Sequence, residues 1–164
     1  MKPLVFVAVP PAAARALRDT GVQPPGVAYA ATPELRESFG YDPDDDEGAD
    51  YAAQVFAGLA GALAGWDRCV LAVAVATLPA GRGATDHGEV HLPTLRWTDV
   101  RAVFVDEPAA RPLMRAYAGA AAGRRLAEVW ADETTQDVVA EHDLLWFAPE
   151  ELDQALDCGT TKGV

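Results

Sequence analysis

Two uninterrupted apolar runs give the chain its clearest structural signal. Residues 4–9 and residues 69–76 are both apolar and both of strand length. An unbroken apolar run indicates a strand that is covered on both faces, so we expect residues 69–76 near the centre of a sheet. Residues 27–31 predict a further, shorter strand.

Between these runs the pattern changes to that of helices. Residues 12–19 follow a Pro pair and end at Gly21, which are typical start and stop signals. Thr32 followed by Pro33 predicts the N-terminus of a short helix. We expect Asp50 to cap a longer helix that ends at Gly65. Its apolar face would comprise Ala52, Val55, Phe56, Leu59, Ala60 and Leu63.

The second half of the chain is less regular. Residues 89–92 and 101–105 predict strands, and a helix follows Pro108 and ends near Gly123. Residues 126–131 are interpreted as an edge strand. Residues 144–148 fit a strand or a helix, and a helical turn begins at Pro149. The Gly-rich residues 78–88 are expected to form a mobile loop.

The alternation of strands and helices predicts a single α/β domain. We expect a mixed β-sheet of about five or six strands with helices packed on it. The domain would span residues 1–156, and residues 157–164 would form a flexible tail. A chain of 164 residues buries enough surface to fold without a disulfide or metal.

The net charge of -12 narrows the possible partners. It repels nucleic acid and anionic membranes, so we expect neither as a partner. No stretch approaches the roughly 18 apolar residues of a membrane helix, and no signal peptide is apparent. Cys69 and Cys158 form no CxxC pair, which favours a reduced, soluble, cytoplasmic protein.

Five segments, in order along the chain, resemble one known family. They are residues 5–10 (VFVAVP), 28–37 (AYAATPELRE), 50–53 (DYAA), 102–106 (AVFVD) and 142–151 (HDLLWFAPEE). Together they are similar to a family of small actinobacterial proteins of unknown function. The chain departs from that family's pattern at Ser38 and in its tail after Leu156. The resemblance implies a stand-alone cytoplasmic α/β protein and supplies no catalytic residue.

Two segments partly match the sequence patterns of metal sites, but neither match is complete. His87 and His91 have helical zinc spacing, but Gly88 and Pro93 oppose a helix. On a strand the two imidazoles would be about 13 Å apart, too far to share an ion. The acidic residues 42–48 lack the Gly and Glu that an EF-hand loop requires, so we expect no metal.

Catalytic constellations are also incomplete. Residues 103–107 (VFVDE) resemble the acidic end of a nucleotide-hydrolysing strand, but the chain has no Gly-Lys pair for a phosphate cradle. Asp106 or Glu107 is instead expected to cap the next helix. Ser38 is the only serine and lies in no nucleophile elbow. We assign no catalytic residue and no cofactor.

A basic helix face leaves two interpretations open. Arg111 and Arg115 are one helical turn apart, and Arg124 and Arg125 follow. They would bind an anionic ligand or an acidic partner, or they would be solvated and neutralise neighbours such as Glu107.

The C-terminal region provides the candidate binding site. An imidazole beside carboxylates and a large aromatic side chain suits a binding cleft or acid–base chemistry. If the strand at residues 27–31 ends near this cluster, Thr32 and Arg36, which follow that strand, converge with His142. The hypothesis names Thr32, Arg36, His142, Trp146 and Glu150. The alternative is that residues 144–147 pack in the core and His142 lies on the surface.

These observations favour a non-enzymatic binding or regulatory domain that recognises a protein partner or a small ligand. One alternative is a small enzyme for a polar or cationic substrate, with His142 and Glu150 or Glu151 as acid and base. A second alternative is a structural subunit that forms a homo-oligomer.

Overall fold

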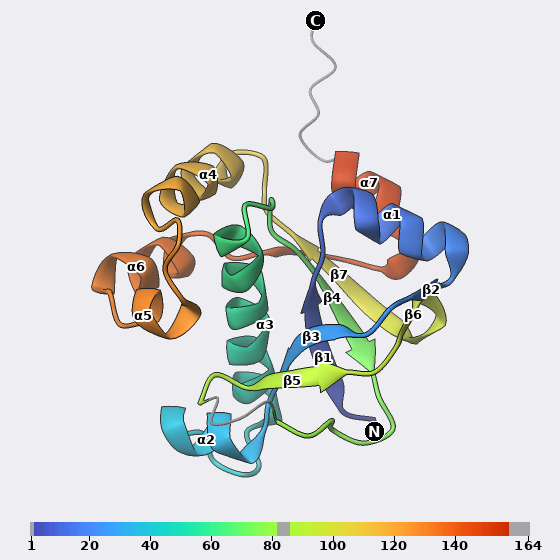
Figure 1. The fold of residues 1–164 in the computed structure, drawn as a ribbon, viewed down its shortest axis with the longest axis horizontal. Coiled ribbons are helices and arrows are strands. Elements are labelled where there is room, and N and C mark those ends of the chain that lie inside the picture. The colour runs from blue at the N-terminus through green and yellow to red at the C-terminus, as the bar shows by residue number, and fades with distance from the viewer. Residues whose placement is uncertain (1, 82–85, 158–164) are drawn as a thin grey trace, which may run out of the picture.

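A computed structural model describes residues 2–81 and 86–157. Its main sheet has six strands in the order β5-β3-β1-β4-β7-β8 (Figure 1). The strands are β1 (Leu4–Ala8), β3 (Gly26–Ala30), β4 (Cys69–Ala74), β5 (Glu89–Leu92), β7 (Val100–Val105) and β8 (Leu145–Phe147). All pairings in this sheet are antiparallel. The predicted α/β class and strand number are confirmed. The expected mixture of parallel and antiparallel strands is not found among the described strands, because each of the five strand pairings in this sheet is antiparallel.

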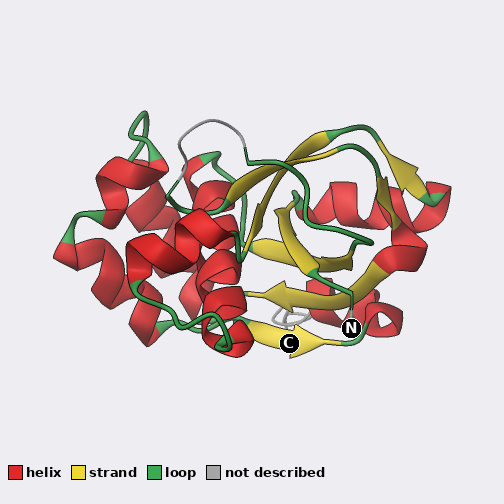
Figure 2. Ribbon diagram, turned by 90° about the horizontal axis from the view of Figure 1, so that it is seen from below, coloured by secondary structure: helices red, strands yellow, loops and turns green. Residues whose placement is uncertain are grey.

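A two-stranded ribbon joins β2 (Val22–Gln23) to β6 (Leu95–Arg96), and 3-10 turns η1 (Trp97–Asp99) and η2 (Pro149–Glu151) precede β7 and α7. Helices cover both faces of the main sheet (Figure 2). They are α1 (Pro11–Thr20), α2 (Pro33–Phe39), α3 (Asp46–Leu63), α4 (Ala110–Ala120), α5 (Leu126–Trp130), α6 (Glu133–Glu141) and α7 (Leu152–Asp157).

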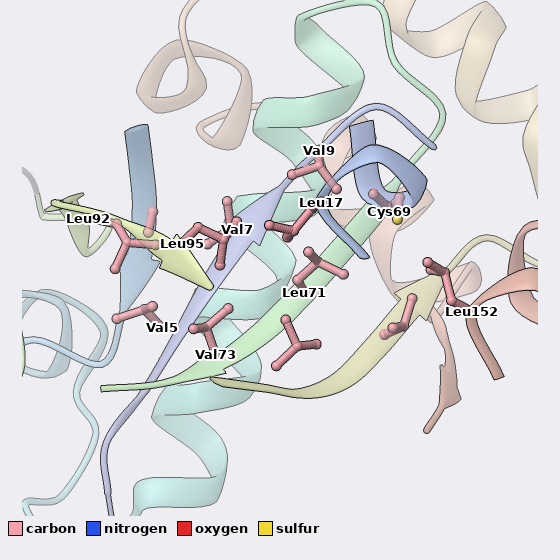
Figure 3. Packing of buried hydrophobic residues seen from close by; sticks show 14 of the residues in the cluster. Val5, Val7, Val9, Leu17, Cys69, Leu71, Val73, Leu92, Leu95 and Leu152 are labelled. Carbon is pink, nitrogen blue, oxygen red and sulfur yellow. The ribbon is translucent and has the colours of Figure 1, made fainter. Parts of the chain in front are cut away.

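The first core lies between the sheet and the helices α1 and α7. Alternate residues of the central strands point into it, so that Val5 and Val7 of β1 meet Leu71 and Val73 of β4 (Figure 3). Leu17 of α1 closes this layer, and α7 is tied to α1 by ion pairs between their surface residues.

The second core lies between the opposite face of the sheet and α3. Phe6, Val70 and Ala72 point to this side and pack against Phe56 of α3. Small residues such as Ala53 let the helix approach the sheet closely. All six residues of β4 are buried, which confirms the central strand expected from the apolar run.

Three predictions about local structure are wrong. Residues 126–131 contain the helix α5, because Leu126, Val129 and Trp130 share a helical face that packs near Leu59. The helix α3 begins before Asp50, and Asp45 caps it by accepting a hydrogen bond from the Gly48 amide at 2.9 Å.

Neither Asp106 nor Glu107 caps α4, whose N-cap is Ala109. The open assignment of residues 144–148 is resolved as the strand β8. The predicted mobile loop at residues 78–88 lies partly outside the described residues, as does nearly all of the predicted tail at 157–164.

Candidate functional site

A groove runs along the part of the sheet that α3 leaves open. α3 lies over β1, β3 and β4, and beside it the same face of β7 and β8 contributes Ala102, Phe104 and Trp146 to the lining of a pocket. The main pocket of this groove measures about 940 Å³. Its floor consists of Leu4, Phe6, Ala72, Ala102 and Phe104.

Two walls border this floor. Asp50, Tyr51 and Gln54 of α3 form one wall, and Trp146 of β8 stands on the other side. A second pocket of about 650 Å³ adjoins the first, because both are lined by Leu4, Asp46, Asp50 and Arg101. The two pockets together are called the α3 groove below.

Trp146 is the most exposed large apolar side chain of the described residues, at 60 %. Its β8 position is paired with Phe104 of β7, so the two rings belong to the same face of the sheet. Tyr51, on the opposite wall, is 46 % exposed. Aromatic surface gathered beside a hollow is typical of a binding site.

The Tyr51 hydroxyl links the two sides of the groove. It donates a hydrogen bond of 2.5 Å to Asp143 Oδ1, three residues before Trp146. Burial, followed by this hydrogen bond, raises the pKa of Tyr51 to about 12. The bond therefore holds the segment that leads into β8 against α3.

The first turns of α3 place carboxylates on the rim of the groove. Asp46 and Asp50 are one helical turn apart and so share a face. Asp46 forms an ion pair with Arg36, in which Oδ1 lies 2.7 Å from Nη2. Asp50 has no hydrogen bond or ion pair to any described residue, and burial, followed by the charge of Asp46, raises its pKa.

Arg36 organises the chain between α2 and α3. Its guanidinium donates to the backbone carbonyls of Ala31, Asp42, Pro43 and Asp45 at 3.3–3.4 Å. It lines the smaller pocket, but these contacts and the Asp46 pair give it a structural role there.

A buried ion pair anchors the segment before β8. Arg68 donates from Nε to both carboxylate oxygens of Asp106, at 3.0 and 3.2 Å, and both side chains are buried. Arg68 Nη2 also donates to the backbone carbonyl of His142 at 2.8 Å. The pair thus joins the start of β4, the end of β7 and the end of α6.

His142 lies behind the groove rather than in it. Its Nδ1 is buried, has no hydrogen-bond partner among the described residues and is 3.9 Å from Glu107 Oε1. The cavity beside it measures only about 10 Å³.

The five residues predicted from the sequence do not line one pocket. Arg36 and Trp146 line the two parts of the α3 groove, whereas His142 lines the small cavity. Thr32 is buried as the N-cap of α2 and accepts a hydrogen bond from the Leu35 amide at 3.1 Å. Glu150 is exposed in the turn η2.

Sequence reasoning missed Asp50, Tyr51 and Phe104 as groove residues. Asp50 and Tyr51 occur in one of the segments that carry the family resemblance, but that pattern says nothing about a groove. Arg68 and Asp106 were also missed as a pair. The sequence did contain a signal for this pair, namely a charged residue next to each of two strongly apolar strands. Arg68 directly precedes β4, and Asp106 directly follows β7.

The basic face is largely neutralised within the chain. Arg115 makes a two-pronged contact with Asp67, and Arg124 and Arg125 pair with Asp132 and Glu128. Within residues 2–81 and 86–157, no three His, Cys, Asp or Glu side chains gather in a way that would hold a metal ion. The helices described there are also too short or too polar to cross a bilayer.

The sequence profile of a family of unknown function, DUF6912, matches residues 4–156. The chain belongs to this family. The resemblance to a family of unknown function inferred from the motifs is therefore confirmed. The DUF6912 match includes the described residues that line the main pocket, together with the Arg68–Asp106 pair. No curated protein and no solved structure matches the chain significantly.

Proposed function

We propose that this protein is a non-enzymatic binding domain whose partner or ligand docks in the α3 groove. The observation that carries the proposal is Trp146, an indole 60 % exposed beside an apolar floor. Leaving such a ring in water forgoes a stabilisation of about 2 kcal/mol, which a ligand covering it would recover. Exposed aromatic side chains of this kind act as anchors in binding surfaces.

The groove is also preformed, which supports the same proposal. The Tyr51–Asp143 hydrogen bond and the Arg68 contact with the His142 carbonyl hold the segment before β8 from two sides. A site that is already ordered loses little conformational entropy on binding.

The enzyme hypothesis has weaker support. His142 has a free Nδ1, but the adjoining cavity of about 10 Å³ has space for about one water molecule, not for a substrate. The carboxylate that lies 3.9 Å from Nδ1 is that of Glu107, and no ion pair joins His142 to Glu150 or Glu151 among the described residues. Glu151 accepts a hydrogen bond from the Ala148 amide instead.

We also propose, from the motif resemblance, that the protein is cytoplasmic and of actinobacterial origin. Cys69 supports the location, because it is a free thiol whose pKa burial raises to about 12. Such a thiol serves packing and needs no oxidising compartment.

The test compares Trp146→Ala with Trp66→Ala. Trp66 is 40 % exposed and does not line the α3 groove, so it is a matched control. Immobilised wild-type protein and both variants are exposed to lysate of the source organism, and retained proteins and metabolites are identified by mass spectrometry. We expect the specifically retained species to fall at least about tenfold on W146A and to persist on W66A.

Circular dichroism and thermal unfolding verify that both variants remain folded. Equal retention by the wild-type protein and both folded variants would contradict the proposal, and so would the absence of any retained species.

A further inference from the structure

The main pocket of the α3 groove has an acidic rim. Among the described residues, four carboxylates and one basic side chain, that of Arg101, line it. The carboxylates are those of Asp45, Asp46, Glu47 and Asp50. Asp45 caps α3 and Asp46 pairs with Arg36, so two of these groups already have a partner within the chain.

Asp50 differs from those two carboxylates. It is half-buried beside the apolar floor and forms no hydrogen bond or ion pair with any described residue. Burial and the like charge of Asp46 raise its pKa, and the charge of Arg36 offsets this only in part. Removing a carboxylate from water without a partner is unfavourable. A cation that enters the main pocket beside Asp50 would relieve this cost, so this pocket is electrostatically complementary to a positive charge.

Trp146 on the opposite side of the groove suits the rest of such a ligand. Indole faces attract ammonium and guanidinium groups, and they also pack against the methylene stems of lysine and arginine. A carboxylate and an indole across one apolar floor therefore match both parts of a basic side chain.

The shape of the groove indicates the kind of molecule that carries this side chain. Its two pockets, of about 650 and 940 Å³, share a border and together exceed the roughly 300–1,000 Å³ of a small-molecule site. The smaller pocket is lined by Lys2, Arg36 and Arg101 as well as by Asp46 and Asp50, so the excess of negative charge lies in the main pocket. This suits an extended segment with an isolated basic residue more than a compact polycation.

We infer that the occupant of the α3 groove is an extended segment of a partner protein, in which a lysine or arginine places its charged head at Asp50 and its stem on Trp146. This inference rests on the proposed function and specifies the partner's chemistry.

The first experiment selects peptides on the full chain. A display library of random dodecapeptides is panned on immobilised wild-type protein and counter-selected on W146A. We expect enriched peptides to share a lysine or arginine flanked by apolar residues. Enriched peptides that depend on Trp146 but contain no basic residue would overturn the inference and leave the proposed function standing. Enriched peptides that bind W146A equally well would contradict both.

The second experiment measures the charge contact directly. The strongest peptide is synthesised with a fluorescein label, and its affinity is compared for wild-type protein, Asp50→Asn and the control Asp137→Asn by fluorescence anisotropy. Asp137 is exposed on α6, away from the groove. We expect D50N to weaken binding about tenfold and D137N by less than about twofold.

A norleucine peptide and a free polyamine complete the second experiment. Replacing the basic residue by norleucine should abolish the difference between wild-type protein and D50N. Equal effects of D50N and D137N would indicate diffuse attraction to an acidic protein and overturn the inference. Displacement of the peptide by an equimolar amount of spermidine would identify a small polyamine as the ligand and would also overturn it.

Discussion

At the scale of single residues, Arg68 and Asp106 are the charged side chains that the described part of the chain buries. Desolvation of two charges is costly, and here it is offset by a two-pronged ion pair and by the His142 carbonyl. Loss of either partner would leave an uncompensated charge in the interior. The pair is therefore a sensitive point for stability, even though it lies outside the groove.

We predict that Arg68→Ala lowers the free energy of unfolding by about 3–5 kcal/mol, because Asp106 stays buried without its cation. Urea denaturation at neutral pH measures this loss. Arg115→Ala is the control, since the Arg115–Asp67 pair has a similar geometry but a mostly exposed arginine. We expect R115A to cost less than about 1 kcal/mol. Similar losses for the two variants would refute the importance of the buried pair.

At the scale of elements, the edge pairing of β3 with β5 depends on one backbone position. Gly88 precedes β5, has φ +81° and accepts a hydrogen bond from the Ala30 amide at 2.9 Å. A Cβ atom there would collide with the Ala30 carbonyl oxygen and lie 2.7 Å from Leu35 Cδ1. Only glycine combines this conformation with so close an approach.

We predict that Gly88→Ala destabilises the protein by at least about 2 kcal/mol and loosens β5 from β3. Thermal unfolding measures the first effect, and amide hydrogen exchange of Ala28 and Ala30 measures the second. Gly26→Ala is the control within β3, because Gly26 lacks a positive φ and no described heavy atom beyond its two chain neighbours lies within 4 Å of the position that a Cβ would take. A G88A variant as stable as G26A would show that the turn adapts without strain.

At the scale of the whole molecule, burial and strand pairing decrease from the centre of the sheet to β8. β4 lies between β1 and β7 and is buried along its whole length. β8 has three residues, is the edge strand of the described sheet with β7 as its neighbour, and exposes Leu145 and Trp146. Elements with few buried contacts open locally at a lower free energy than the core.

We therefore predict graded amide exchange across the sheet. The amides of Val70 to Val73 should exchange only through global unfolding, whereas those of Leu145 to Phe147 that are hydrogen-bonded should exchange about a hundredfold faster. Native-state exchange followed by NMR across a denaturant series separates the two mechanisms. Protection of β8 equal to that of β4 would show that the groove wall is part of the cooperative core.

Local patterns were sufficient for most of the fold. The apolar runs predicted β1 and β4, and the Pro and Gly punctuation located α1 and α2 to within one or two residues. The pattern failed at residues 126–131, because a five-residue helix is too short for a periodic signal and depends on packing against its neighbours.

The candidate site was less predictable. Residue type alone pointed to Trp146 and Arg36, and both line the α3 groove. Nothing local distinguishes Asp50 and Tyr51 from other residues on a helix surface. The side chains of His142 and Thr32 are of types that often occur in binding sites. In the fold, however, His142 lines a small cavity and Thr32 caps a helix.

The sequence by itself determined the α/β class, the central strand β4 and the membership of a family with unknown function. Hydrophobic patterns and sequence motifs can be identified segment by segment, without knowledge of the tertiary structure. The tertiary structure alone decided which face of the sheet stays open and which side chains border it. Tyr51 meets Asp143 across 92 residues, and Arg68 meets Asp106 across 38. Such contacts depend on strand order and helix placement, which are set by the packing of the whole chain rather than by any one segment.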